Sequence, residues 1–304
     1  MSRHSSERRN AKKTIKRNDV RNSRLLITAA VVVALGLLWF AVMRFFASPD
    51  AYSGATAEVR YFDVGQGDAA MFIWDDGAIL IDAGTNSSQE KLVEYINRLG
   101  IDKIDCAVFS HPHEDHIGGA DSVLEAFVVE SVIMPDLMAD SVTYTSMMEC
   151  VVEEGCPVYE AVAGDVYTFG DVTLTVLSPA QEFGDFNLDS AVVMIEYGEV
   201  NFLFMADCEE EAELAALEAM GEGAFECDVL KVGHHGSHTS TSDALLAAAT
   251  PDIAVISCGE DNEYGHPHRE TLQKLYERGI DVYRTDEEGT VIIYTDGVTF
   301  WCGN

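Results

Sequence analysis

The run of residues 110–117 is the most constraining feature of this sequence. It reads Ser-His-Pro-His-Glu-Asp-His-Ile, a His-x-His-x-Asp-His pattern. Imidazole nitrogens and carboxylate oxygens are ligands that Zn²⁺ and Mn²⁺ favour. On an extended segment, side chains two positions apart point to the same side, so His111 and His113 can bind one ion. Asp115 and His116 then face a second position. A solvated His-rich loop is the alternative; the pattern favours a metal site.

Charge is divided unevenly along the 304 residues. Residues 1–24 contain nine Lys or Arg and two acidic residues. From residue 50 onward there are 9 Lys or Arg against 50 Asp or Glu, a net charge of −41. Proteins that hold nucleic acid neutralise its phosphates with Lys and Arg. The acidic body therefore lacks the composition of a broad nucleic-acid-binding surface.

An uncharged stretch, Leu25–Met43, separates the basic tail from the acidic body. As a helix it is long enough to span a hydrocarbon core, and Trp39 suits an interface position. The basic flank predicts a cytoplasmic N-terminus and an extracytoplasmic body. A cleaved signal peptide is the alternative, but its basic leader and apolar stretch would both be unusually long. We therefore expect a single-pass cell-membrane protein with a basic cytoplasmic tail (1–24), a transmembrane anchor (25–46) and a linker (47–57).

The body, residues 58–304, alternates short apolar runs with amphipathic ones, which predicts strands interspersed with helices. The expected strands are Val59–Asp63, Ala69–Trp74, Ala78–Asp82, Cys106–Ser110, Ser131–Met134, Val172–Leu177, Ala191–Tyr197, Val200–Met205, Val229–Val232, Ile253–Ser257, Val282–Arg284 and Val291–Thr295. The expected helices are Gln89–Leu99, Ala120–Phe127, Glu209–Met220 and Pro267–Arg278. Two halves of this kind predict one α/β domain in which two sheets pack together beneath outer helices.

Further reactive residues follow the expected strands. Asp82 and Asp207 each end an apolar strand, His234 and His235 follow another, and His266 opens a helix. Side chains at strand ends are held by a rigid scaffold while loops shape the site. The seven Cys form no CxxC spacing, and most are expected to be small buried apolar side chains. The pair Cys150 and Cys156 has a spacing that permits a short-loop disulfide.

Taken together, these motifs resemble the metallo-beta-lactamase superfamily and, among its branches, the hydrolase domain of the ComEC competence proteins. The resemblance covers about residues 56–300 and rests on Asp63-Val64-Gly65-Gln66-Gly67-Asp68, the Asp82 turn, His111–His116, Asn187-Leu188-Asp189-Ser190, Asp207, His234-His235-Gly236-Ser237 and Tyr264-Gly265-His266-Pro267. It implies an αββα sandwich with a dinuclear metal site at one edge.

The resemblance also implies a ligand set. One ion takes His111 and His113, and the other takes Asp115 and His116. Asp207 bridges the two ions, and His235, in preference to His234, completes the second. Many members supply a third imidazole to the first ion, but residues 117–233 contain no His. This open position is shared with the ComEC branch and a phosphorylcholine esterase, and it disfavours a β-lactamase or thiolesterase.

The expected activity is hydrolysis of phosphodiester bonds by a water that two divalent ions, Zn²⁺ or Mn²⁺, activate. Asp115, His234 and His266 are the candidates for catalytic roles, the two histidines as donors to the leaving group or the phosphate. Asp82 is expected to orient a ligand imidazole. Residues expected beside the ligands or at the rim of the site are Asp63, Gln66, Asp68, Asn187, Ser190 and Lys231.

The substrate remains open between two classes. The resemblance favours nuclease action on single-stranded DNA during uptake, as in competence. A single predicted membrane span and an acidic body are as compatible with a small extracytoplasmic phosphoester such as cell-wall phosphorylcholine. A non-catalytic metal-binding accessory membrane protein and a lactone or thioester hydrolase are the other hypotheses. No protein partner is predicted.

Overall fold

The computed structural model describes residues 54–303. The predicted basic tail, the anchor and most of the linker fall in residues 1–53 and lie outside the described residues. Between residues 54 and 303, no helix is both long and apolar enough to cross a bilayer.

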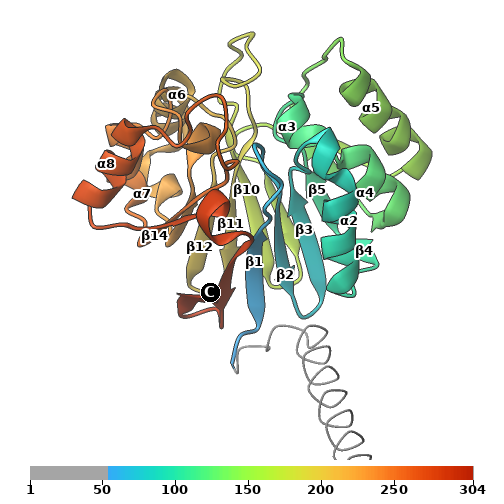
Figure 1. Ribbon diagram of the computed structural model, residues 1–304, viewed down its shortest axis with the longest axis horizontal. Coiled ribbons are helices and arrows are strands. Elements are labelled where there is room, and N and C mark those ends of the chain that lie inside the picture. The colour runs from blue at the N-terminus through green and yellow to red at the C-terminus, as the bar shows by residue number, and fades with distance from the viewer. Residues whose placement is uncertain (1–53, 304) are drawn as a thin grey trace, which may run out of the picture. The chain divides into compact units, whose positions relative to one another are not determined.

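Two large β-sheets form the centre of the described domain (Figure 1). The first contains, in spatial order, β17 (Phe300–Cys302), β16 (Val291–Thr295), β1 (Ala57–Tyr61), β2 (Ala70–Trp74), β3 (Gly77–Ile81), β5 (Cys106–Val108), β7 (Val132–Met134) and β8 (Val158–Glu160). The second contains β15 (Asp281–Arg284), β14 (Ile253–Ile256), β13 (Val229–Lys231), β12 (Val200–Phe204), β11 (Val192–Tyr197), β10 (Val172–Ser178) and β9 (Val166–Phe169). The short strands β4 (Lys103–Ile104) and β6 (Val128–Val129) pair separately.

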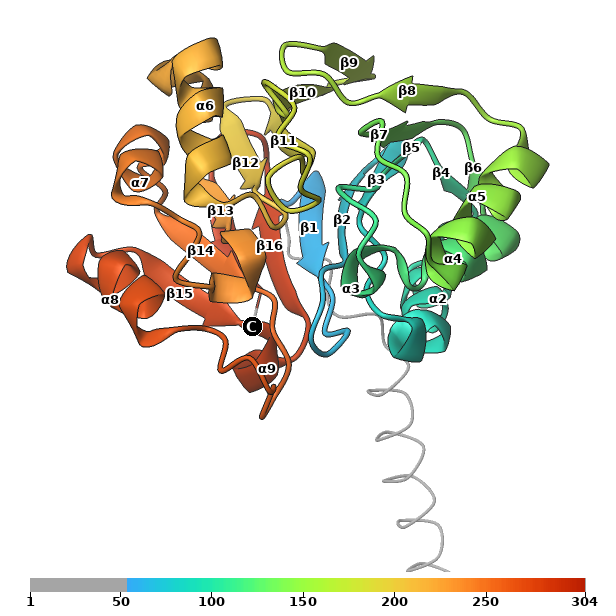
Figure 2. The same cartoon turned by 90° about the horizontal axis from the view of Figure 1, so that it is seen from above.

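Helices cover the outer face of each sheet (Figure 2). Those of the first half are α2 (Gln89–Arg98), α3 (Glu114–Ile117), α4 (Ala120–Ala126) and α5 (Val142–Glu154), with the 3-10 turn η1 (Asn86–Ser88). Those of the second half are α6 (Glu210–Met220), α7 (Asp243–Ala249), α8 (Arg269–Glu277) and α9 (Thr285–Glu288), with η2 (Glu222–Phe225) and η3 (Gly233–Gly236). The αββα sandwich predicted from the sequence is thereby confirmed.

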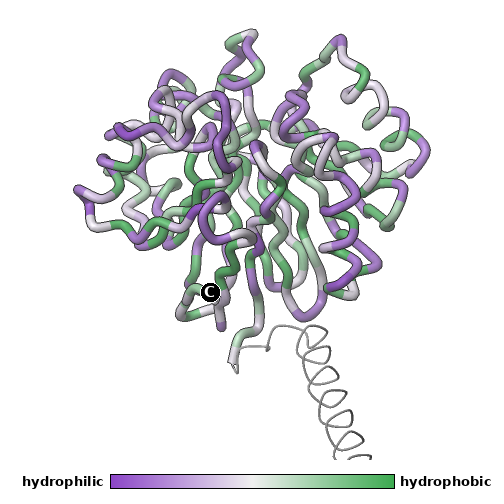
Figure 3. The backbone as a smooth tube through the Cα atoms, in the orientation of Figure 1, coloured by the Kyte–Doolittle hydropathy of each residue, from purple (hydrophilic) through white to green (hydrophobic). Residues whose placement is uncertain are grey.

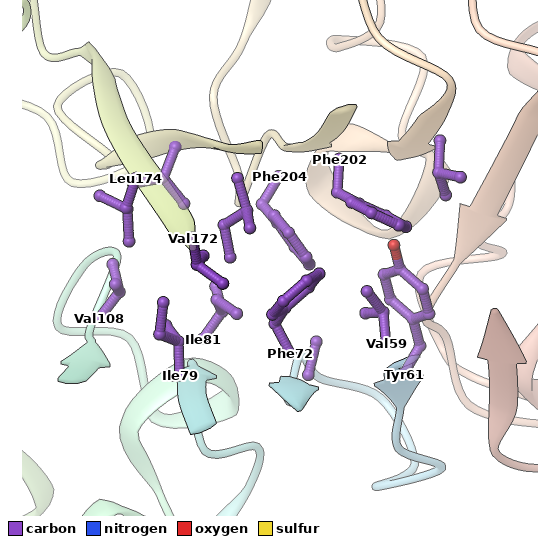
Figure 4. Close-up of a cluster of buried hydrophobic side chains, with 14 of the residues drawn as sticks. Val59, Tyr61, Phe72, Ile79, Ile81, Val108, Val172, Leu174, Phe202 and Phe204 are labelled. Carbon is purple, nitrogen blue, oxygen red and sulfur yellow. The ribbon is translucent and has the colours of Figure 1, made fainter. Parts of the chain in front are cut away.

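Side chains that alternate along each strand fill two apolar layers, one between the sheets and one beneath the outer helices. Successive side chains of a strand point to opposite faces, so Phe72 and Trp74 of β2 enter the core between the sheets, while Met71 packs beneath the helices. In the close-up of this core, Phe72 points toward the opposite sheet, from which Phe202 and Phe204 project (Figure 4). The hydropathy colouring follows the same pattern, with apolar strands inside and more polar helices outside (Figure 3).

Every strand and helix expected from the sequence is present, with ends that differ by one or two residues. The helix expected to begin at Pro267 begins at Arg269, because His268 is its N-cap. The sequence did not predict the helices α3, α5, α7 and α9 or the strands β4, β6, β8, β9 and β17. Strand β8 is exposed along its whole length, so it carries no apolar alternation.

The suggested disulfide is absent. Cys150 and Cys156 are both free thiols, like the other cysteines of the described range. Each packs instead against the apolar cluster beneath the outer helices of the first sheet. These two side chains therefore behave as small apolar groups.

The topology brings several strand ends to one edge of the sandwich. Strands β3 and β5 run parallel in the first sheet, and β12, β13 and β14 run parallel in the second. Because parallel neighbours end at the same edge of a sheet, the loops that follow these strands meet there. Those loops carry the residues that the sequence singled out.

The aromatic centre of the core provides a test of the fold. Phe72 is fully buried, and its ring lies 5.5 Å from Phe202 and 5.9 Å from Tyr197 between centroids. Phe72→Ala should lower the free energy of unfolding by about 3–5 kcal/mol, because a cavity replaces these contacts. Urea unfolding of the full-length protein measures this loss. The exposed-site control Val298→Ala should change it by less than about 0.5 kcal/mol. A loss below about 1 kcal/mol for Phe72→Ala would contradict this packing.

Candidate metal centre

Asp82 holds the histidine run in place. It directly follows β3 and adopts φ +56°, a left-handed conformation that is uncommon outside glycine. Its carboxylate accepts hydrogen bonds from the Ser110 N–H (2.8 Å) and the Ser110 hydroxyl (2.7 Å). The same carboxylate lies 2.8 Å from His116 Nδ1. His116 therefore presents its other nitrogen, Nε2, to the centre of the site.

Asp207 lies at the centre of the imidazoles. It follows β12 and is 2% exposed. Its Oδ1 lies 3.2 Å from His116 Nε2 and 3.6 Å from His235 Nε2, and its Oδ2 lies 3.9 Å from His111 Nε2. One carboxylate thus faces imidazoles from loops that follow strands of both sheets.

The two adjacent histidines after β13 differ in their surroundings. Both have left-handed backbone angles, φ +47° at His234 and +52° at His235. The buried His235 Nε2 lies 3.2 Å from Asp115 Oδ2. His234 is partly exposed, with Nδ1 3.2 Å from Glu209 Oε1. His235 belongs to a cluster with Asp115, His116 and Asp207 that could hold an ion, whereas His234 does not.

A buried ion pair lies beside the Nδ1 side of the His235 ring. The Asp68 carboxylate lies 3.2 Å from His235 Nδ1 and 2.7 Å from Lys231 Nζ. The backbone N–H of Asp68 also donates to the Asp115 carbonyl at 3.0 Å. The preceding Gly67 has to be glycine, because a Cβ there would lie 2.4 Å from that carbonyl oxygen. The glycine-rich turn therefore packs directly against the histidine run.

Among the described residues three groups could hold an ion; Asp68, Asp82 and His116 form one of them, and the other two share Asp207. The first is His111, His113 and Asp207, and the second is Asp115, His116, Asp207 and His235. The ligand atoms of each group lie within 4.8 Å of one another. Buried polar atoms normally have a hydrogen-bond partner, but His116 Nε2 and Asp207 Oδ1 have none. Unpaired nitrogen and oxygen atoms of this kind fit a divalent cation.

The electrostatics of the cluster agree with this fit. Burial alone raises the pKa of Asp207, but the charges of His116 and His235 outweigh it and hold this pKa well below its usual range. Burial lowers the pKa of His235, yet Asp207 and Asp68 raise it overall to about 10. The carboxylates thus create a negative potential that attracts positive charge, which a divalent ion supplies.

A cleft of about 510 Å³ opens over the cluster. It is lined by Gln66, His113, Glu114, Asp115, Asn187, Asp207, His234, His235, Glu263, Tyr264 and His266. None of these is Lys or Arg. Tyr264 is 61% exposed and its ring stacks on His266, with 5.6 Å between centroids. The Phe186 ring lies 5.5 Å from that of His113. The cleft is therefore lined by four carboxylates and no Lys or Arg, and the Tyr264 ring is part of its lining.

Two residues that the sequence suggested for the rim lie elsewhere. Asp63 is not among the residues lining the cleft; it forms an ion pair with Lys91 (2.8 Å). Ser190 is buried and its hydroxyl donates to the Phe186 carbonyl. The predicted Lys231 is buried in the ion pair beneath His235.

Sequence reasoning assigned no role to three cleft residues, Glu114, Glu263 and Tyr264. Glu114 lies within the histidine run, and the other two precede His266 in the same loop. Their proximity along the chain to predicted site residues is the sequence signal that could have identified them.

Competence proteins are among the relatives of this chain. It is 32% identical over 254 residues to ComE operon protein 3 of Bacillus subtilis (strain 168), an alignment that covers 77% of this chain and 32% of that protein. It is 29% identical over 262 residues to Recombination protein 2 of Haemophilus influenzae, covering 84% of this chain and 30% of that protein. The chain thus spans about a third of the length of these curated relatives.

The sequence profile identifies the family, and a solved structure shows the same fold. The metallo-beta-lactamase fold protein YhfI from Bacillus subtilis superimposes with a TM-score of 0.53 at 13% identity, covering 79% of this chain and 100% of that one. The profile of the metallo-beta-lactamase superfamily matches residues 63–260, more than half of the sequence. This chain therefore belongs to the metallo-beta-lactamase superfamily.

Proposed function

We propose that this protein is a metal-dependent hydrolase of phosphodiester bonds. The observation that carries the proposal is the pair of ligand groups that share Asp207 at the floor of the cleft. In the proposal one ion binds His111 and His113 with Asp207, and a second binds the group containing His235. Two divalent ions, Zn²⁺ or Mn²⁺, supply Lewis acidity that suits in-line displacement at phosphorus.

The surrounding residues have supporting roles in this proposal. Asp82 orients His116 through Nδ1. The Ser257 carbonyl, 3.1 Å from His235 Nδ1, does the same for His235, and the Asp68 carboxylate of the buried ion pair faces the same nitrogen. His234 and His266 line the cleft without belonging to either ligand group. Their ring N–H groups can donate to phosphate oxygens. The first ligand group has no third imidazole, which leaves room for a substrate oxygen.

Nuclease action on single-stranded DNA is the first candidate. The resemblance of the sequence motifs to the ComEC competence proteins supports it, together with the relative named Recombination protein 2. We further propose that residues 25–46 anchor the protein in the cell membrane with the hydrolase outside the cytoplasm. The uncharged stretch and its basic flank support this placement.

A small phosphoester with a cationic group is the second candidate. The observation that favours it is the acidic cleft, which no Lys or Arg lines. Aromatic faces together with carboxylates bind quaternary ammonium groups well. Tyr264 and Glu263 are adjacent cleft residues of this chemical type.

Removal of the shared carboxylate tests the metal assignment. Asp207→Ala should abolish tight loading of metal and lower the hydrolysis of bis-p-nitrophenyl phosphate by more than about 10³-fold, because this carboxylate serves both ligand groups. Metal analysis and steady-state kinetics measure the two effects, and a chelator should abolish the hydrolytic activity of the wild type. Asp243→Ala, at an exposed carboxylate, is the control. Two retained ions with full turnover would show that Asp207 does not bridge.

Loss of the carboxylate behind His116 should weaken metal binding without removing a ligand. In Asp82→Ala the buried His116 Nδ1 loses its partner, so affinity for Zn²⁺ should fall about 10–100-fold. Competition with a chromophoric chelator measures the dissociation constant. The exposed-turn variant Asp75→Ala should leave it unchanged. An unaltered constant in Asp82→Ala would mean that Asp82 does not orient the ligand.

Substrate preference separates the two candidates. If the enzyme is a nuclease, it should cut a single-stranded oligonucleotide, and the KM should depend only weakly on salt. Each phosphate contact adds about 0.7 to the slope of log affinity against log salt. No Lys or Arg lines the cleft, so we expect a slope below about 1. A kcat/KM more than about tenfold higher for p-nitrophenylphosphorylcholine would favour the second candidate instead.

A further inference from the structure

The side chain of Gln66 joins two loops at the cleft. It lies on the glycine-rich turn between β1 and β2, and its Oε1 accepts a hydrogen bond from the Gly259 N–H at 3.0 Å. Its Nε2 lies 3.4 Å from His266 Nδ1. A backbone N–H only donates, so it must face the amide oxygen. The orientation of the Gln66 amide is therefore fixed, with its NH₂ group toward His266.

This orientation determines where His266 carries its proton. An amide NH₂ group only donates, so His266 Nδ1 must accept. In a neutral imidazole the other nitrogen then holds the hydrogen. Nε2 lies on the side of the ring away from Gln66, and His266 lines the cleft. The ring thus offers an N–H donor to whatever the cleft binds.

Other contacts hold the residue in place. The backbone N–H of His266 donates to Asn262 Oδ1 at 2.9 Å, and its backbone carbonyl accepts from Asn262 Nδ2 at 2.6 Å, which fixes the loop from which the ring projects. Tyr264 stacks on the ring at an interplanar angle of 21°. The His234 ring lies 5.7 Å away between centroids. A flipped imidazole would place a carbon against Gln66 and lose that hydrogen bond.

We propose that Gln66 is a positioning residue that fixes the Nε2–H tautomer of His266, and that this N–H stabilises the leaving oxygen of the substrate. The inference rests on phosphoester hydrolysis being the activity. Hydrolysis breaks the bond from phosphorus to the leaving oxygen and forms one from phosphorus to the water oxygen. The leaving oxygen takes its proton from solvent, while His266 donates a hydrogen bond and keeps its own proton.

Two variants separate this role from a structural one. Gln66→Glu can keep the hydrogen bond to Gly259, but a carboxylate only accepts, so it reverses the tautomer of a neutral His266. Gln66→Leu loses both hydrogen bonds and leaves both tautomers populated. If Gln66 sets the tautomer, activity should fall from the wild type to Gln66→Leu and further to Gln66→Glu. If Gln66 has only a structural role, Gln66→Glu should be more active than Gln66→Leu.

The direct measurement is the tautomer itself. Full-length, Zn²⁺-loaded protein labelled with ¹⁵N-histidine is examined by two-bond ¹⁵N–¹H correlation at pH 9, well above the ordinary pKa of an imidazole. The signals of His266 are assigned by their loss in His266→Gln. We expect a protonated Nε2 in the wild type and a protonated Nδ1 in Gln66→Glu. A protonated Nδ1 in the wild type would overturn the proposal.

Kinetics at the same pH test the consequence. For diphenyl phosphate, whose leaving group is poor, Gln66→Glu should lower kcat about 10²-fold with little change in KM. For bis-p-nitrophenyl phosphate the loss should be about tenfold or less, because that leaving group needs less stabilisation. Gln273→Glu, on the exposed face of α8, is the matched control and should behave as wild type.

Equal losses on both substrates, or a Leu variant slower than Glu, would overturn the role of Gln66. If the wild type hydrolyses neither diester, the proposed function fails instead. The tautomer measurement is independent of turnover and still decides whether Gln66 positions His266.

Discussion

The meeting of Asp207 with imidazoles from both halves of the sandwich is the interaction on which the rest of the site depends. The carboxylate is buried, and its Oδ1 and the facing His116 Nε2 have no hydrogen-bond partner. Unpaired buried polar atoms are unfavourable, so the fold must hold them together against this cost. A divalent cation at this cluster would remove the penalty, in agreement with the metal chemistry of the metallo-beta-lactamase fold.

The scaffold holds this cluster through backbone strain at the ends of strands. Left-handed angles occur at Asp82, Ala206, His234 and His235, and none of these is glycine. Such conformations are kept only where the surrounding structure imposes them. Here parallel strands and their packed loops do so. The strain aims side chains from separate strands at one point, and the glycine-rich turn before β2 then packs against the histidine run.

The strands and helices were largely predictable from local sequence patterns, whereas the ligand groups that combine distant residues were expected only from the family resemblance. Apolar alternation located the strands, and His111 to His116 carries its ligands within one short run. The resemblance favoured His235 over His234, in agreement with the structure, but the local sequence does not distinguish the two, because both are adjacent residues with left-handed backbone angles. The position of Asp63 outside the cleft could not be predicted either, because its ion pair with Lys91 depends on how α2 packs. The orientation of Gln66 depends on a partner 193 residues away.

Anomalous diffraction from crystals grown with Zn²⁺ tests the central claim most directly. The account predicts two peaks above the zinc edge, each about 2.0–2.2 Å from an Asp207 oxygen. One should also contact His111 and His113, and the other should contact the group that contains His235. A single peak, or two peaks that do not share Asp207, would contradict the dinuclear centre.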